Sequence, residues 1–96
     1  MIQVIWSPQS HRDLESIREY IAADSPVYAN LVVQRLVKAV ERLQAFPASG
    51  RIVPERNSPD IREVIVRPYR VVYRQGEGRV EIITIFRASR LLTDLS

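Results

Sequence analysis

Residues 61–74 read I-R-E-V-I-V-R-P-Y-R-V-V-Y-R, and this stretch decides the fold because it predicts two β-strands joined by a tight turn. Its side chains alternate between two faces at the period of two that is typical of strands. Val64 and Val66 share one face, Tyr69, Val71 and Tyr73 share another, and Arg70, Val72 and Arg74 point opposite those three. Because Pro68 cannot donate a hydrogen bond to a sheet ladder, we expect the turn at Arg67-Pro68 and the second strand from Tyr69.

The same stretch carries four arginines, and the whole chain has thirteen Arg but one Lys, Lys38. All of the net charge of +3 lies in residues 51–96, which hold nine basic and six acidic side chains. The guanidinium fork pairs with carboxylate or phosphate in two parallel hydrogen bonds, which an ammonium cannot do. The charge therefore predicts an acidic protein or a nucleic acid as partner, and the alternative is a solvated sheet face.

Composition excludes several classes of site. The chain of 96 residues predicts a single domain, 1–96, with 46% hydrophobic and 26% charged residues. Without cysteine it has no disulfides, thiol nucleophiles or thiolate metal sites, and its one histidine, His11, reads as a surface residue. No apolar run approaches the ~18 residues of a membrane span. We expect a cytoplasmic protein without a metal site, cofactor or membrane partner.

Two Ser-Pro pairs predict the helices. A serine N-cap followed by proline at the first helical position favours helix starts at Pro8 and Pro26, ending near Ala23 and Ala45. The first helix carries an apolar stripe of Leu14, Ile17 and Ile21, and the second one of Ala29, Val32, Val33, Leu36, Val40 and Leu43. The short connection predicts an antiparallel helical hairpin, and its stripes need a sheet to pack against.

The remaining segments complete the sheet. Residues 2–6 predict a first strand, residues 48–60 a loop, and residues 75–78 a turn with two glycines. Residues 79–86 predict a last strand that is apolar on both faces, with Val80 and Ile82 opposite Ile83 and Ile85, and therefore internal. The expected fold is α+β, in the order β-α-α-β-β-β, with the helical hairpin packed on a mainly antiparallel sheet.

Particular residues now point to a family. They are, in chain order, Asp13-Leu14, Ile17, Tyr20-Ile21, Ser25-Pro26, Ala29, Leu43, Phe46-Pro47, Gly50-Arg51, Ile61-Arg62-Glu63, Tyr69-Arg70-Val71-Val72-Tyr73-Arg74 and Ile85-Phe86-Arg87-Ala88-Ser89-Arg90. In order and spacing this set closely resembles the RelE/ParE superfamily of bacterial toxins, over nearly the whole chain. The resemblance implies a toxin that forms a hetero-oligomer with its cognate antitoxin, whose C-terminal segment wraps and neutralises it.

The resemblance also implies two alternative targets. RelE-like members cut mRNA in the ribosomal A site with basic residues, whereas ParE-like members inhibit DNA gyrase. The nucleases carry lysines on the strand that corresponds to residues 61–66, where this chain has Glu63 and Ile65. Arg70 matches the nuclease arginine that follows the hairpin tyrosine, and Arg87 or Arg90 matches a second basic position.

Two further positions bear on that choice. The tyrosine that the nucleases place near the C-terminus has no counterpart in residues 91–96. In another subgroup a glutamate and a histidine act as acid and base; here Glu63 could serve as the base, but Arg87 stands where histidine is often found. We therefore favour a ParE-type gyrase inhibitor, and a ribosome-dependent nuclease using Arg70, Arg87, Arg90 and Glu63 is the alternative.

Binding residues follow from the same reading. We expect Arg70, Arg87 and Arg90 to form one exposed patch at the end of the sheet. The full set expected to contact the target or the antitoxin is Arg67, Arg70, Arg74, Arg87 and Arg90, with Leu31 and Leu36 under an antitoxin helix. The alternative for Arg70 and Arg74 is an ion pair with Glu63 or Glu81 on a neighbouring strand.

Overall fold

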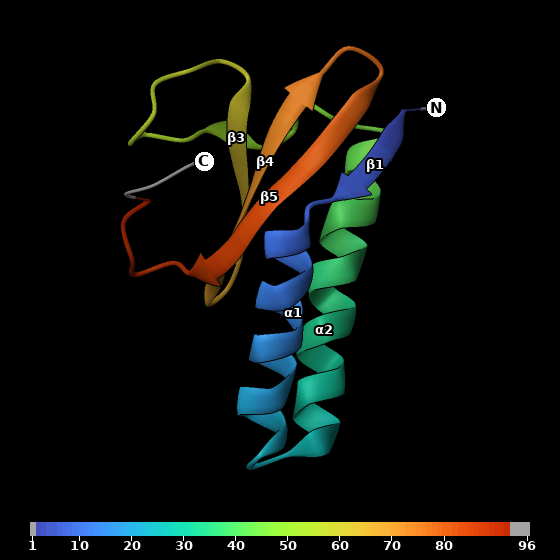
Figure 1. The fold of residues 1–96 in the computed structure, drawn as a ribbon, viewed down its shortest axis with the longest axis vertical. Helices are drawn as coiled ribbons and strands as arrows, with labels where there is room; N and C mark the ends of the chain where they lie inside the picture. Colours follow the sequence, from blue (N-terminus) through green and yellow to red (C-terminus); the bar gives the residue numbers. More distant parts are fainter. Residues whose placement is uncertain (1, 93–96) are drawn as a thin grey trace.

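The computed structural model describes residues 2–92, in which a helical hairpin and a five-stranded sheet lie against each other (Figure 1). The elements in chain order are β1 (Gln3–Trp6), α1 (Pro8–Ala22), α2 (Pro26–Glu41), the 3-10 helix η1 (Arg42–Gln44), β2 (Arg51–Ile52), β3 (Ile61–Val66), β4 (Tyr69–Gly76) and β5 (Arg79–Arg87). The predicted α+β order is confirmed. The structure has one strand more than predicted, because the two-residue strand β2 lies inside residues 48–60, which were expected to form a loop.

The strand order in the sheet is β1-β5-β4-β3-β2. β1 runs parallel to β5, and the other three pairings are antiparallel. The hairpin of β3 and β4 turns at Arg67-Pro68, as the sequence predicts. Since β5 lies between β1 and β4, the expectation that this strand is internal is also confirmed.

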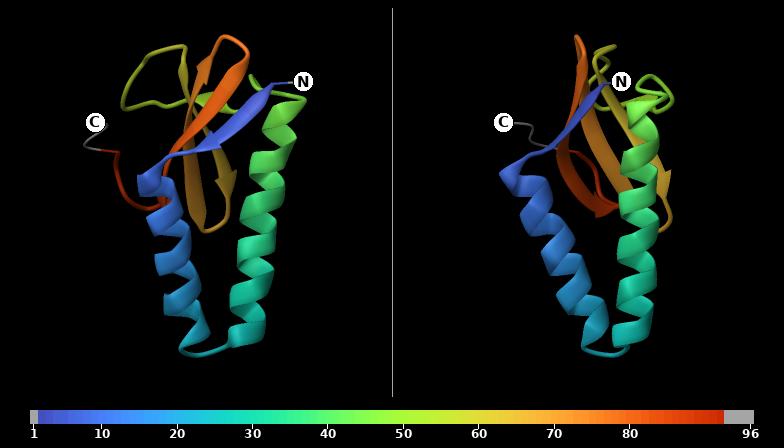
Figure 2. Two further views of the ribbon diagram at one scale, coloured as in Figure 1. Left: turned by 45° about the vertical axis from the view of Figure 1, so that its right-hand side comes forward. Right: turned by 90° about the vertical axis from the view of Figure 1, so that its right-hand side faces the viewer.

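Both helices start at the predicted serine caps. The backbone N–H of Ser10 donates to Ser7 Oγ at 3.0 Å, and that of Tyr28 donates to Ser25 Oγ at 3.1 Å. α2 ends at Glu41, earlier than predicted, because η1 completes the segment. The helical hairpin covers one face of the sheet and extends beyond its end (Figure 2). No helix in residues 2–92 is long and apolar enough to cross a membrane.

The core lies between the helices and the sheet. Register pairs Val64 with Val71 and Val66 with Tyr69, so these side chains lie on one common inner face rather than on two. They pack there with the α2 stripe, whose six predicted residues are all buried.

One part of the face prediction for β5 is wrong. The register shifts between Val72 and Tyr73, which pair with Thr84 and Ile82, so Ile83 is the extra residue of a β-bulge. Ile82 and Ile85 therefore both reach the inner core, while Ile83 packs on the outer face.

The outer face of the sheet is also covered. Val53 from the loop after β2 and Leu92 from the C-terminal segment pack there on Ile61 and Val72. All four side chains are buried. A second, smaller core therefore holds two surface segments, residues 53–60 and 88–92, against the sheet, and these segments carry the polar groups described next.

Candidate functional site

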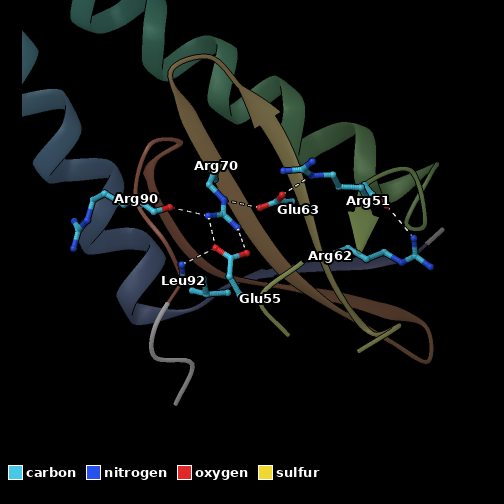
Figure 3. A network of polar contacts seen from close by, with 8 residues as sticks. Arg51, Glu55, Arg62, Glu63, Arg70, Arg90 and Leu92 are labelled. Carbon is cyan, nitrogen blue, oxygen red and sulfur yellow. Dashed lines mark hydrogen bonds and ion pairs between the residues drawn. The ribbon is translucent and has the colours of Figure 1, made fainter. Parts of the chain in front are cut away.

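Arg70 lies at the centre of an ion-pair network on the outer face of the sheet (Figure 3). Its side chain is 5% exposed and lies over the ring of Phe86, with 5.0 Å between Cζ and the ring centroid. Its Nε donates to Glu63 Oε1 at 2.6 Å. Its Nη1 and Nη2 each donate to one oxygen of Glu55 at 2.8 Å, which is the two-bonded fork of a guanidinium on a carboxylate.

The same arginine also binds the C-terminal segment. Arg70 Nη1 donates to the carbonyl oxygen of Arg90 at 2.8 Å, and the backbone N–H of Leu92 donates to Glu55 Oε2 at 2.9 Å. Four of the five N–H groups of the guanidinium are therefore engaged within the chain. One arginine joins β3, β4, the loop after β2 and the segment after β5.

Glu63 is the second hub of the network. Its carboxylate is fully buried and lies between two guanidinium groups, with Arg51 Nε donating to Oε2 at 2.5 Å and Arg70 Nε donating to Oε1. The charges alternate along the chain of contacts from Arg51 through Glu63 and Arg70 to Glu55. A buried charge is tolerated when it is paired in this way.

The network fixes the charge of its members. The hydrogen bonds from Arg70 lower the pKa of Glu55 from 4.5 to about 2, and the bond from the Leu92 N–H adds to this. The hydrogen bonds that Arg70 donates to the Glu55 carboxylate raise the pKa of Arg70 above its usual value, although burial acts against them. Both groups are therefore charged throughout the physiological pH range.

The structure separates the predicted arginines into two kinds. Arg70 was expected in an exposed patch, and that expectation is wrong, because loop 53–60 and the C-terminal segment cover it. Its ion pair with Glu63, the alternative interpretation, is confirmed. Arg74 is exposed opposite Glu81 in the register, but no ion pair joins them in the described part of the chain. The exposed arginines of the predicted set are Arg67, Arg74, Arg87 and Arg90.

Two other predicted residues change role. Glu63 cannot serve as a general base for a substrate, because both oxygens are bonded to arginines and the side chain is buried. Leu36 is fully buried in the core, so it cannot lie under a partner helix, whereas Leu31 is 51% exposed. The difference arises because Leu36 faces the sheet and Leu31 lies outside the buried stripe of α2.

Sequence reasoning missed Glu55 and Arg51 as members of the network. Glu55 lies on a loop without periodicity, fifteen residues from Arg70. The only feature of the sequence that pointed to a buried ion-pair network was the excess of arginine over lysine, because buried ion pairs favour the guanidinium.

A groove lies beside the network, between α1 and the end of β5. Its volume is about 1170 Å³. Arg12 on α1, Arg87 at the end of β5 and Arg90 in the following segment line it, together with apolar side chains that include Ile17, Ile83 and Leu91. A smaller hollow of about 640 Å³ opens above the network, with Arg51, Arg67 and Arg90 around it. The exposed arginines therefore line concave surfaces on both sides of residues 88–92.

Comparison with known proteins gives concordant results. Residues 4–92 match the family model of the ParE toxin of type II toxin-antitoxin system, parDE. Toxin RelE2 of Caulobacter vibrioides is 37% identical over 92 residues, covering 95% of this chain and 100% of that toxin. The chromosomal ParDE TA system from P. aeruginosa superposes with a TM-score of 0.75 at 26% identity, covering 91% of this chain and 96% of that one. The YoeB dimer of Staphylococcus aureus shares the fold, with a TM-score of 0.58 at 16% identity and coverage of 86% and 92%.

Proposed function

Because the chain belongs to the ParE toxin family of type II toxin-antitoxin systems, we propose that it is a ParE-type toxin that inhibits DNA gyrase. A cognate antitoxin neutralises it in a hetero-oligomeric complex. Membership in the family implies the antitoxin, and the choice of gyrase as target is the proposal.

The state of Arg70 supports this choice. This residue matches the arginine that follows the hairpin tyrosine in the RelE-like nucleases, where it could clamp a phosphate. Here four of its five N–H donors are bonded within the chain. A carboxylate, Glu55, already fills the fork that a scissile phosphate would need. The carboxylate best placed to act as a base, Glu63, is buried between arginines. Cleavage of RNA requires a proton acceptor and a charge clamp that reach the substrate, and neither residue reaches solvent.

The alternative is a ribosome-dependent ribonuclease. Two observations favour it. One relative is named RelE2, and Arg87 and Arg90, one or the other of which matches a second basic position of the nucleases, are both exposed. Arginine with its pKa above about 12 is a poor base, so these residues supply a clamp without a proton acceptor. This alternative therefore ranks second.

Purified toxin tests the choice. We expect inhibition of supercoiling by DNA gyrase, and filamentation with DNA damage signalling when the toxin is induced alone in cells. The same preparation is added to ribosomes that hold mRNA with an empty A site, where we expect the message to stay intact. Toxin bound to the product of the adjacent gene is the control and should be inactive in both assays. Cleavage of the message with no effect on gyrase would reverse the ranking.

A further inference from the structure

Two irregular segments, residues 53–60 and 88–92, cover the ion-pair network, and we call them together the outer lid. The backbone of the first segment is bonded to the sheet at Val53 and Asp60, and that of the second at Ala88. In the described part of the chain, the other backbone hydrogen bonds of the lid join residues only three or four positions apart, as in turns. The lid is therefore attached at its ends and forms no ladder with the strands.

The lid also has a small apolar anchor. Of its side chains, those of Val53 and Leu92 are buried, and they pack on Ile61 and Val72 in the outer core. The main core on the other face of the sheet contains ten buried side chains. Segments that have few buried apolar contacts and lack regular structure open locally at a lower free energy than the whole fold. Burial therefore predicts that the lid is the part of the outer face that opens first.

The two segments of the lid are bonded to each other through one carboxylate. Glu55, in the first segment, accepts from the backbone N–H of Leu92, in the second segment, at 2.9 Å. Arg70 donates to the Glu55 carboxylate and to the carbonyl oxygen of Arg90, so it holds both segments at once (Figure 3). Removal of either segment breaks bonds that hold the other, and this coupling favours opening as a single unit.

Opening leaves no unpaired charge in the sheet. Arg70 keeps its hydrogen bond to Glu63 on the neighbouring strand, and Glu63 keeps its second bond to Arg51. Glu55, whose side chain is already 19% exposed, passes into water with its charge hydrated. The large cost of leaving a buried ion without a partner therefore does not arise.

We propose that the outer lid opens as one unit while the rest of the fold stays intact, and that this opening gates the access of solvent to Arg70. With the lid closed, the carboxylate of Glu55 occupies the guanidinium fork and competes with any outside anion. With the lid open, the fork faces solvent. Because Glu63 stays between two arginines in both states, opening releases a charge clamp without a general base, and the inference does not depend on the choice of target.

Hydrogen exchange of the full chain tests the cooperative opening. In the unmodified protein, the amides of Asn57 and Arg90, one in each segment, should show equal protection, lower than that of Val71 in the middle of the sheet. Leu92→Ala weakens the anchor of the second segment alone, and it should speed exchange in both segments by the same factor, about tenfold, while Val71 is unchanged. Val53→Ala, in the first segment, should have the same effect on both.

Chemical modification tests the gate. A dicarbonyl reagent that reacts with free guanidinium groups should modify Arg70 slowly in the unmodified protein and about tenfold faster in Leu92→Ala, in step with the exchange of Asn57. Arg12, which is exposed on α1, is the internal control and should react equally fast in both proteins. Leu31→Ala, on the exposed side of α2, is the matched control variant and should alter neither rate.

Each result decides the inference. If Leu92→Ala speeds exchange only in residues 88–92, the segments open independently and the single lid is refuted. Protection of Asn57 and Arg90 equal to that of Val71 would show that the outer face opens only when the whole chain unfolds. Modification of Arg70 at the same rate in the unmodified protein and in Leu92→Ala would refute the gate. The gyrase and ribosome assays judge the proposed function separately.

Discussion

Replacement of Glu55 by Gln tests whether the ion-pair network holds the outer face of the sheet together. The amide has nearly the same size as the carboxylate, but it lacks the charge and has one acceptor oxygen in place of two. The fork of hydrogen bonds from Arg70 is therefore lost. Glu63 still neutralises the guanidinium, so no unpaired charge remains buried.

The expected loss of stability follows from the contacts. Hydrogen bonds to charged groups contribute about 1.5 to 3 kcal/mol, and exposed ion pairs at most about 1 kcal/mol. The side chain of Glu55 is 19% exposed and lies between these limits. We expect a loss of about 2 kcal/mol, which for a domain of this size lowers Tm by roughly 8 to 16 °C.

The pH dependence gives a second, independent signature. The pKa of Glu55 is lowered from 4.5 to about 2 in the folded state. The pair therefore stabilises the fold above pH about 4.5, and this contribution is lost as the pH falls toward 2. The Glu55→Gln variant should lack this component, so that the stabilities of the two proteins converge between pH 4.5 and 2.

Thermal unfolding followed by circular dichroism at pH 7, 4 and 2.5 measures both effects. Glu77→Gln is the control, because Glu77 lies in the exposed turn between β4 and β5 and makes no ion pair in the described part of the chain. A Tm of Glu55→Gln within 2 °C of the unmodified protein at pH 7 would refute the reasoning. A difference that stays constant down to pH 2.5 would refute its electrostatic basis.

Three further predictions follow from the core and the exposed arginines. Gly50→Ala should destabilise by more than about 2 kcal/mol in urea unfolding, because a Cβ there would lie 2.6 Å from the Glu63 carbonyl oxygen; Gly76→Ala, with no contact under 3.6 Å, is the control. Leu36→Ala should cost about 2 to 5 kcal/mol, against less than about 0.5 for Leu31→Ala, and equal losses would contradict the assigned burial. Arg87→Ala should reduce toxicity on induction at unchanged Tm, whereas Arg70→Ala should lower both; full toxicity of Arg87→Ala would show a merely solvated side chain.

The helices and strands were predictable because their signals are local. A serine followed by a proline fixes each helix start, and alternation on either side of Pro68 fixes the central hairpin. The bulge at Ile83 was not predictable, since one extra residue leaves the apolar pattern of β5 unchanged. Sequence patterns report which residues are apolar, and they do not report where a strand changes register.

The site was predictable only in part. Alternation correctly put Arg70 on the face opposite Tyr69, but that face was taken to be open to solvent. Val53 and Leu92, from segments without periodicity, cover it and bring Glu55 to the guanidinium. Long-range packing of irregular segments therefore decided whether this arginine faces a partner or the protein itself.

The pairing of β1 with β5 has a consequence for folding. It joins the first and last strands, and the bond from Ser7 to Ile83 spans 76 positions of the chain. The contacts between α1 and α2 join residues that are close in sequence, so the helical hairpin can form early during synthesis. By contrast, β1 has no partner strand until residues 79–82 have been made. During synthesis β1 therefore stays unpaired until residues 79–82 of β5 have left the ribosome. We expect slow closure of the sheet, with β1 as the last strand to become protected from hydrogen exchange during refolding.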